Sequence, residues 1–181
     1  MAKSTAILLR KFPLTDTSLI VHWCSADLGL IKTVARGARR PGSALSGQLD
    51  LFYDVEIEYA TARRGDLHTL REASVLNYRH GLQTSYLRVL AASYFVRLIE
   101  IVAERDTPIV SLHDLLQRAL NWLCDNEPSV KGMLHFEKEL TRHLGLWSDS
   151  DPTPPLRALQ DVYHKIPEQR LLLLERLGTE G

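Results

Sequence analysis

The residues with the clearest chemistry lie between Gly29 and Ser43, where the sequence reads GLIKTVARGARRPGS. This stretch carries four cations within nine residues and no acidic residue: Lys32, Arg36, Arg39 and Arg40. Guanidinium groups bind phosphate oxygens through paired hydrogen bonds, and glycine lets the backbone approach a ligand closely. The pattern favours contact with a phosphate backbone. The alternative is a solvated hairpin whose charges prevent a sheet edge from aggregating.

A smaller basic group follows in the sequence Arg63-Arg64-Gly65-Asp66, which is typical of a tight turn. We expect Arg63 and Arg64 to be secondary contacts for the same ligand. Charge is unevenly distributed along the chain, although its 22 basic and 22 acidic residues balance. Residues 1–49 contain seven basic and two acidic side chains, whereas residues 81–181 contain 11 basic and 14 acidic ones. A polyanion responds to such a local potential rather than to the net charge.

Stacking of bases on aromatic side chains is the second common component of single-strand binding. The candidates in the first half of the chain are Phe12, Trp23, Phe52, Tyr53 and Tyr59. Trp23 lies in an apolar run and is predicted to be a core residue. Phe52 and Tyr53 are adjacent, so they point to opposite faces if both lie in one strand. The sequence does not single out a stacking residue.

A third group of cations, Lys131, Lys138 and Arg142, lies in a predicted helix that also contains Leu134, Phe136, Leu140 and Leu144. Cations beside an apolar groove can receive an acidic peptide that ends in hydrophobic side chains. The alternative interpretation is ordinary surface cations beside the core of a helical bundle.

Catalytic and metal-binding patterns are weak. His135, Glu139 and His143 share one helical face, but positions i and i+8 are about 12 Å apart, too far for one ion to take both histidines. The motifs HExxH, GxSxG, GxxxxGK and GxGxxG do not occur. We therefore expect no enzyme, no metal and no cofactor. A metal-dependent hydrolase that uses His135 and Glu139 is the least favoured alternative.

The elements that position these residues divide at about residue 79. Before it, short β-rich runs predict five strands, at residues 4–10, 19–25, 31–35, 51–59 and 68–76. Five short strands in this space favour a five-stranded OB-fold β-barrel or a comparable Greek-key barrel. After it, apolar residues recur at helical spacing and predict an all-α helical bundle. The first expected helix ends near Glu104, and the second begins at Ser111. The third, fourth and fifth span residues 129–144, 156–163 and 167–177. The predicted class is α+β, with domains at 1–79 and 80–181.

Two cysteines, Cys24 and Cys124, do not suggest a disulfide framework. No run of about 20 apolar residues occurs, and the apolar stretch near the start is too short for a signal peptide. We expect a soluble, cytoplasmic protein with no membrane partner.

The order of these features resembles the RecO family of bacterial recombination mediators over nearly all of residues 4–147. The most specific part is the segment GLIKTVARGARRPGSALSGQLDLF, and the LHTLREASVL strand and the helical ending HFEKELTRHLGL agree with it. The resemblance implies an OB-fold followed by a helical domain. It also implies binding to single- and double-stranded DNA, annealing of complementary strands, contact with the C-terminal tail of single-stranded DNA-binding protein, and cooperation with RecR to load RecA. Association with the nucleoid follows from these roles.

One feature departs from the family. Many relatives carry a four-cysteine zinc module after the position equivalent to Leu146, whereas this chain continues with WSDSDPTPP and has no cysteine beyond Cys124. Zinc is therefore not expected, and contacts that depend on that insertion are in doubt. The sequence thus predicts a non-enzymatic recombination mediator in DNA repair. The alternative is a protein-interaction adaptor whose barrel contacts DNA only incidentally.

Overall fold

A computed structural model describes residues 1–105 and 107–178, which form two units. Residues 1–78 and 104–113 make up the first unit, and residues 79–103 and 114–181 make up the second. The segment 104–113 follows the first long helix in the sequence, yet it packs with the strands. Sequence periodicity does not indicate this placement.

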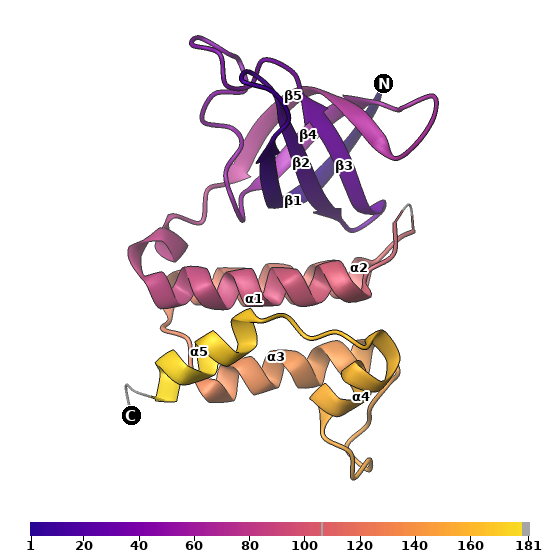
Figure 1. The fold of residues 1–181 in the computed structure, drawn as a ribbon, viewed down its shortest axis with the longest axis vertical. Helices are drawn as coiled ribbons and strands as arrows, with labels where there is room; N and C mark the ends of the chain where they lie inside the picture. The colour runs from indigo at the N-terminus through magenta and orange to yellow at the C-terminus, as the bar shows by residue number, and fades with distance from the viewer. Residues whose placement is uncertain (106, 179–181) are drawn as a thin grey trace. The chain divides into compact units, whose positions relative to one another are not determined.

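The first unit is a closed barrel of five strands (Figure 1). The strands are β1 (Ala2–Pro13), β2 (Leu19–Ser25), β3 (Gly29–Ala35), β4 (Asp54–Ala60) and β5 (Leu67–Asn77). Their order around the barrel is β1-β2-β3-β5-β4; β3 and β5 are parallel and the other neighbours are antiparallel. This arrangement confirms the predicted OB-fold barrel and all five predicted strands.

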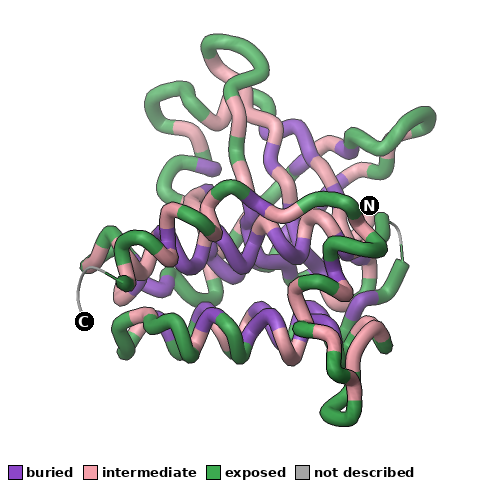
Figure 2. The backbone as a smooth tube through the Cα atoms, turned by 60° about the horizontal axis from the view of Figure 1, so that its bottom comes forward, coloured by how far each residue is buried: buried purple, intermediate pink, exposed green. Residues whose placement is uncertain are grey.

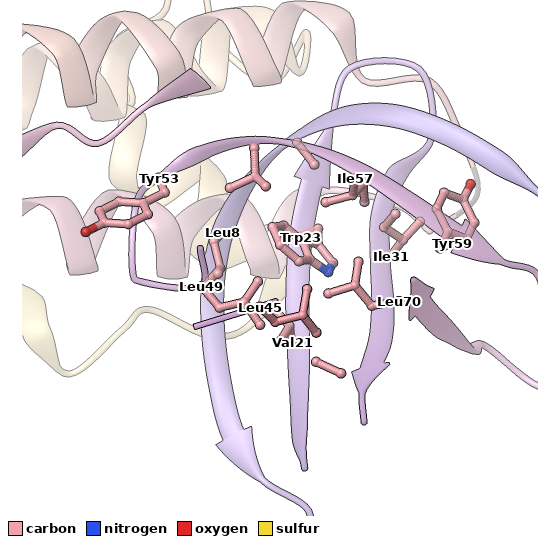
Figure 3. Packing of buried hydrophobic residues seen from close by; sticks show 13 residues of the cluster. Leu8, Val21, Trp23, Ile31, Leu45, Leu49, Tyr53, Ile57, Tyr59 and Leu70 are labelled. Carbon is pink, nitrogen blue, oxygen red and sulfur yellow. The ribbon is translucent and has the colours of Figure 1, made fainter. Parts of the chain in front are cut away.

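The barrel core is built from the inward-facing residues of every strand (Figure 3). Trp23 is fully buried, and its indole Nε1 donates a 2.8 Å hydrogen bond to Thr33 Oγ1. Leu45 and Leu49 from the β3–β4 connection also enter this core. The prediction that Trp23 is a core residue is therefore confirmed, and the basic connection is anchored at its C-terminal end.

The segment before β4 differs from the prediction. Phe52 has a φ of 69°. Its amide donates a 2.8 Å hydrogen bond to the carbonyl of Leu8, and the amide of Leu8 donates a 2.9 Å bond to the carbonyl of Tyr53. The left-handed backbone at Phe52 breaks the alternation of a strand, so Phe52 and Tyr53 are both buried, at 4% and 8% exposure. The prediction that the strand begins at residue 51 is therefore wrong, and the two rings do not lie in one strand.

The β2–β3 turn makes a close contact with residues 104–109. Gly29 has a φ of 70°, and a Cβ placed there would lie 2.5 Å from the carbonyl oxygens of Glu104 and Thr107. The amides of Leu30 and Ile109 donate hydrogen bonds of 3.1 and 2.9 Å to Glu104 and Ala26. Gly29 is therefore required both by its conformation and by the packed backbone beside it.

In the same turn, the carboxylate of Asp27 accepts hydrogen bonds from two hydroxyls, Ser25 Oγ at 2.5 Å and Ser4 Oγ at 2.8 Å. The bond from Ser25 is the main reason that the pKa of Asp27 lies below its ordinary value. A lowered pKa in the folded state stabilises the fold above the ordinary carboxyl pKa, and this stabilisation is lost as the pH falls through the lowered value.

We expect Asp27→Asn to lower the free energy of unfolding of the barrel by about 1 kcal/mol at neutral pH, because solvent weakens the bonds of an exposed carboxylate. The difference from the original protein should shrink below about pH 4, where the carboxylate gains its proton. Urea unfolding at neutral pH and at about pH 3 measures both quantities. An equal difference at the two pH values would contradict this assignment.

The second unit is helical (Figure 1). Its elements are η1 (His80–Thr84), α1 (Tyr86–Val102), α2 (Val110–Asp125, whose first turn belongs to the first unit), α3 (Val130–His143), α4 (Pro155–Tyr163) and α5 (Gln169–Gly178). The five predicted helices are confirmed within two residues, and only the short η1 was not predicted. Ser129 caps α3 by accepting a 3.1 Å hydrogen bond from the amide of Gly132, and Gly145 follows the helix with a φ of 68°.

The core of the helical unit is apolar, with one buried polar cluster. The rings of Phe95 (α1) and Phe136 (α3) stack with their centroids 4.1 Å apart. Glu137, only 2% exposed, accepts a 2.6 Å hydrogen bond from Tyr94 Oη and a 2.8 Å bond from Arg170 Nε. This triad joins α1, α3 and α5. Among the described residues, no helix is long and apolar enough to cross a membrane.

Candidate nucleic-acid interface

The arginines of the β3–β4 connection lie on a series of tight turns that begins where β3 ends. The amides of Arg40 and Ser43 donate hydrogen bonds of 3.0 and 3.1 Å to Gly37 and Arg40, and Gly37 has a φ of 68°. The amide of Arg39 also donates a 3.0 Å bond to Thr17 in the β1–β2 loop. Its own turns and the neighbouring β1–β2 loop therefore hold this basic segment in place.

Arg36, Arg39 and Arg40 are exposed. None of the three forms an ion pair with any residue that the structure describes, and the one recorded side-chain bond is a 3.4 Å contact from Arg39 Nη1 to the Thr15 carbonyl. Their guanidinium groups are thus available to an external anion. Figure 2 shows that the connections projecting from the strands are largely exposed.

A groove of about 550 Å³ runs beside these arginines. Arg36 and Arg40 line it together with several hydroxyls and a small apolar floor: Leu14, Thr15, Thr17, Ser18, Val34, Gly37, Leu67 and Thr69. Arginines provide charge-assisted hydrogen bonds to phosphate, and hydroxyls add neutral ones. The groove can therefore hold a sugar-phosphate chain.

Lys32 has a different environment. Its Nζ lies 3.2 Å from Asp66 Oδ2, and the same oxygen is 2.6 Å from Arg105 Nη1. The bond from Lys32 is the main reason that the pKa of Asp66 lies below its ordinary value. Lys32 is thus partly neutralised by a residue of the β4–β5 hairpin, which the sequence did not reveal.

The structure places Arg63 and Arg64 apart from the other arginines. Both are exposed on the β4–β5 hairpin, which projects from a different part of the barrel than the β3–β4 connection (Figure 1). β5 is parallel to β3, and its first residue, Leu67, pairs with Lys32 rather than with the end of β3. The structure therefore brings together Arg36, Arg39 and Arg40, with Lys32 between them and the second hairpin.

One exposed cation near the groove was missed. Arg71 lies two residues after Thr69 in β5, at a register shift where Glu58 and Tyr59 oppose Glu72 and Leu70. This β-bulge leaves Arg71 pointing outward, and it makes no ion pair within the described part of the chain. The signal available in the sequence was the outward alternation set by the predicted inward positions of the strand.

The three cations of α3 are also separated by the structure. Lys138 Nζ is 2.7 Å from Asp149 Oδ1, and Arg142 Nη2 is 2.5 Å from Asp149 Oδ2. Both cations also lie over the Trp147 ring, at 5.2 and 6.0 Å from its centroid. The connection after α3 therefore occupies this half of the cationic face.

Lys131 instead lines an apolar pocket of about 460 Å³ within the helical unit. Its polar lining residues are Lys131, Arg118 and His135. Its apolar walls come from α1, α2, α3 and α5 and include Ala91, Phe95, Leu115, Ala119, Trp122, Leu123, Met133, Phe136 and Leu173. Trp122 is 47% exposed although it is a large apolar residue. This pocket combines positive charge with unfilled apolar surface.

His135, Glu139 and His143 do not gather around a point. Glu139 is 2.6 Å from Arg142, and within residues 1–105 and 107–178 no group of three potential metal ligands is found.

The topology, the groove and its arginines define the first unit as an OB-fold barrel, a class whose outer strands and loops often bind oligonucleotides. Two family models match the chain: Recombination protein O N terminal at residues 1–79 and Recombination protein O C terminal at residues 83–150. The chain therefore belongs to the RecO family.

Curated relatives agree with this assignment. A DNA repair protein RecO from Rhodopirellula baltica is 31% identical over 77% of this chain and 52% of its own length. One from Cyanothece sp. is 35% identical over 67% of this chain and 41% of its own length. One from Burkholderia orbicola is 29% identical over 100% of this chain and 62% of its own length. The chain spans about half the length of the curated relatives it matches.

Proposed function

We propose that this protein is a non-enzymatic recombination mediator that binds single- and double-stranded DNA through the basic groove of its barrel. The observation that carries the proposal is the exposure of Arg36, Arg39 and Arg40 beside a hydroxyl-lined groove, without acidic partners in the described residues. Lys32, Arg63 and Arg64 add secondary contacts from the β3 strand and the second hairpin.

Phosphate contacts suit the annealing of complementary strands. Two strands repel each other through their phosphates, and cations that bind the backbone reduce this repulsion. Such contacts leave the base edges free to pair, because sequence is read at the bases and not at the phosphates. Most of the affinity is then electrostatic, with a steep dependence on salt and little sequence preference.

The proposal is tested with a fluorescent single-stranded oligonucleotide titrated at several salt concentrations. The variant Arg36→Ala/Arg39→Ala/Arg40→Ala should bind at least about tenfold more weakly at low salt. Its plot of log affinity against log salt should be less steep by about two, since each phosphate contact on a single strand contributes roughly 0.7.

A charge-matched control separates a local from a global effect. Arg157→Ala/Lys165→Ala/Arg176→Ala removes the same number of exposed cations from the helical unit and should leave the salt dependence nearly unchanged. Equal losses in both triple variants, or none in either, would contradict the proposed interface and favour the adaptor function.

A partner site in the helical unit is the second part of the proposal. The pocket beside Lys131 suits an acidic peptide with an apolar end, the chemistry expected of the C-terminal tail of single-stranded DNA-binding protein. Lys138 and Arg142 reach such a peptide only where Asp149 leaves them accessible. RecR is proposed as a further partner, with RecA loading as the indirect result.

We expect a labelled peptide of several aspartates ending in phenylalanine to bind this pocket. Lys131→Glu should weaken binding about fivefold or more, because it places a negative charge beside the peptide's acidic residues, and Ala119→Trp should do so by filling the pocket. Lys165→Glu is the control for net charge. Fluorescence anisotropy measures the affinities, and unchanged binding in both pocket variants would exclude this site.

A further inference from the structure

The outer surface of the barrel carries an aromatic cluster next to the basic groove. Strand register places Arg10 opposite His22 and Phe12 opposite Ile20. Val21 and Trp23 are buried inside the barrel, so the alternating residues Ile20 and His22 face outward, together with their partners on β1.

Phe12 makes two contacts that fix its ring in this surface. The guanidinium carbon of Arg10 lies 4.5 Å from the centroid of the Phe12 ring. The His22 ring approaches at 5.3 Å between centroids, with an interplanar angle of 63°. These contacts hold three planar groups together on one face of the barrel.

Phe12 is also the one candidate aromatic residue that remains near the surface. Of the five rings weighed from the sequence, Trp23, Phe52, Tyr53 and Tyr59 are at most 8% exposed, whereas Phe12 is intermediate in exposure. Four of the five are therefore excluded as stacking platforms by burial alone.

The cluster is continuous with the arginine groove. Across the strands, Phe12 pairs with Ile20, Ile20 with Val34, and Val34 with Thr69. Val34 and Thr69 are also part of the groove beside Arg36 and Arg40. Neighbouring strands are about 4.8 Å apart, so Phe12 lies about 10 Å from the groove floor at Val34. A chain with phosphates in the groove can place bases over the ring.

We propose that Arg10, Phe12 and His22 form a base-contact platform that makes the barrel bind single-stranded DNA more tightly than duplex DNA. This inference rests on the proposed binding of DNA in the basic groove. Unpaired bases offer their faces to aromatic and guanidinium planes, whereas in a duplex those faces are stacked within the helix. Phosphates are present in both forms, so the groove arginines contribute to both.

The test compares single-stranded and duplex oligonucleotides of one length, titrated by fluorescence anisotropy with the full chain. Phe12→Ala should weaken single-strand binding about 5-fold to 100-fold and change duplex binding less than about twofold. The salt dependence should stay as in the original protein, because the ring makes no phosphate contact. Phe12→Trp should restore single-strand affinity, and Leu76→Ala, at an exposed apolar residue of β5 outside the groove, is the control for an apolar truncation on the barrel.

Thermal unfolding of each variant separates loss of the fold from loss of the contact. If Phe12→Ala unfolds early, Phe12→Leu keeps most of the apolar volume, removes the aromatic plane, and should show the same selective loss. Equal losses for single-stranded and duplex DNA, or full single-strand affinity in the Leu variant, would overturn the platform. The proposed function fails separately, when the arginine triple variant binds like the original protein.

Discussion

Replacing Glu137 by alanine is expected to lower the free energy of unfolding of the helical unit by about 3–5 kcal/mol, because one member of a buried ion pair is removed. Glu137 is 2% exposed and accepts bonds from Tyr94 Oη and Arg170 Nε at 2.6 and 2.8 Å. Without it, a partly buried guanidinium and a buried phenol both lose their acceptor. The loss should fall on α1, α3 and α5 together, since the triad joins these three helices.

Urea unfolding followed by far-ultraviolet circular dichroism, whose signal comes mainly from the helices of the second unit, measures this change. Glu139→Ala is the matched control on the same helix, because Glu139 makes a surface pair with Arg142 that contributes about 0.5 kcal/mol or less. The double variant Glu137→Leu/Arg170→Leu should recover much of the loss, because apolar pairs replace buried ion pairs with little penalty. A Glu137→Ala protein as stable as the Glu139→Ala protein would contradict the role of the triad.

Replacing Trp23 by alanine is expected to lower the free energy of unfolding of the barrel by about 3–5 kcal/mol. The indole is fully buried in the barrel, and its truncation leaves a cavity among Leu8, Ile31 and Ile57 of the same cluster (Figure 3). The hydroxyl of Thr33, also fully buried, loses its 2.8 Å partner as well. Because Trp23 lies outside the proposed DNA groove, its loss should affect the proposed DNA binding only under conditions where the barrel unfolds.

Hydrogen exchange of peptides from β2 and β3 reports barrel opening, and it should rise steeply in the Trp23→Ala protein. Trp122→Ala is the control for the same chemical change at a residue that is 47% exposed, and its effect on these peptides should be small. Unchanged exchange in β2 and β3 would show that the indole is not central to barrel stability.

The elements of this fold were largely predictable from local patterns. The alternation of Leu19–Ser25 and the periodicity of Tyr86–Val102 come from residues that neighbour each other in the sequence, so the sequence itself carries the signal. The ends of α3 are likewise set by local chemistry, the Ser129 cap and the turn at Gly145, and the predicted span of 129–144 agrees with Val130–His143 within one residue at each end. Residues 51–53 were assigned wrongly, because the φ of Phe52 depends on hydrogen bonds to Leu8 in another strand.

The candidate sites were predictable only as groups of residue types. The sequence by itself determined the OB barrel, the helical bundle and the cluster of Arg36, Arg39 and Arg40, because each depends on spacing within one segment. Tertiary structure alone decided that Asp66 partly neutralises Lys32 and that Asp149 forms ion pairs with Lys138 and Arg142. It also decided that Phe12 remains near the surface while the other four candidate rings are buried. The physical reason is that charge pairing and burial depend on which distant residues the folded chain brings within a few ångströms, and neither composition nor periodicity records those distances.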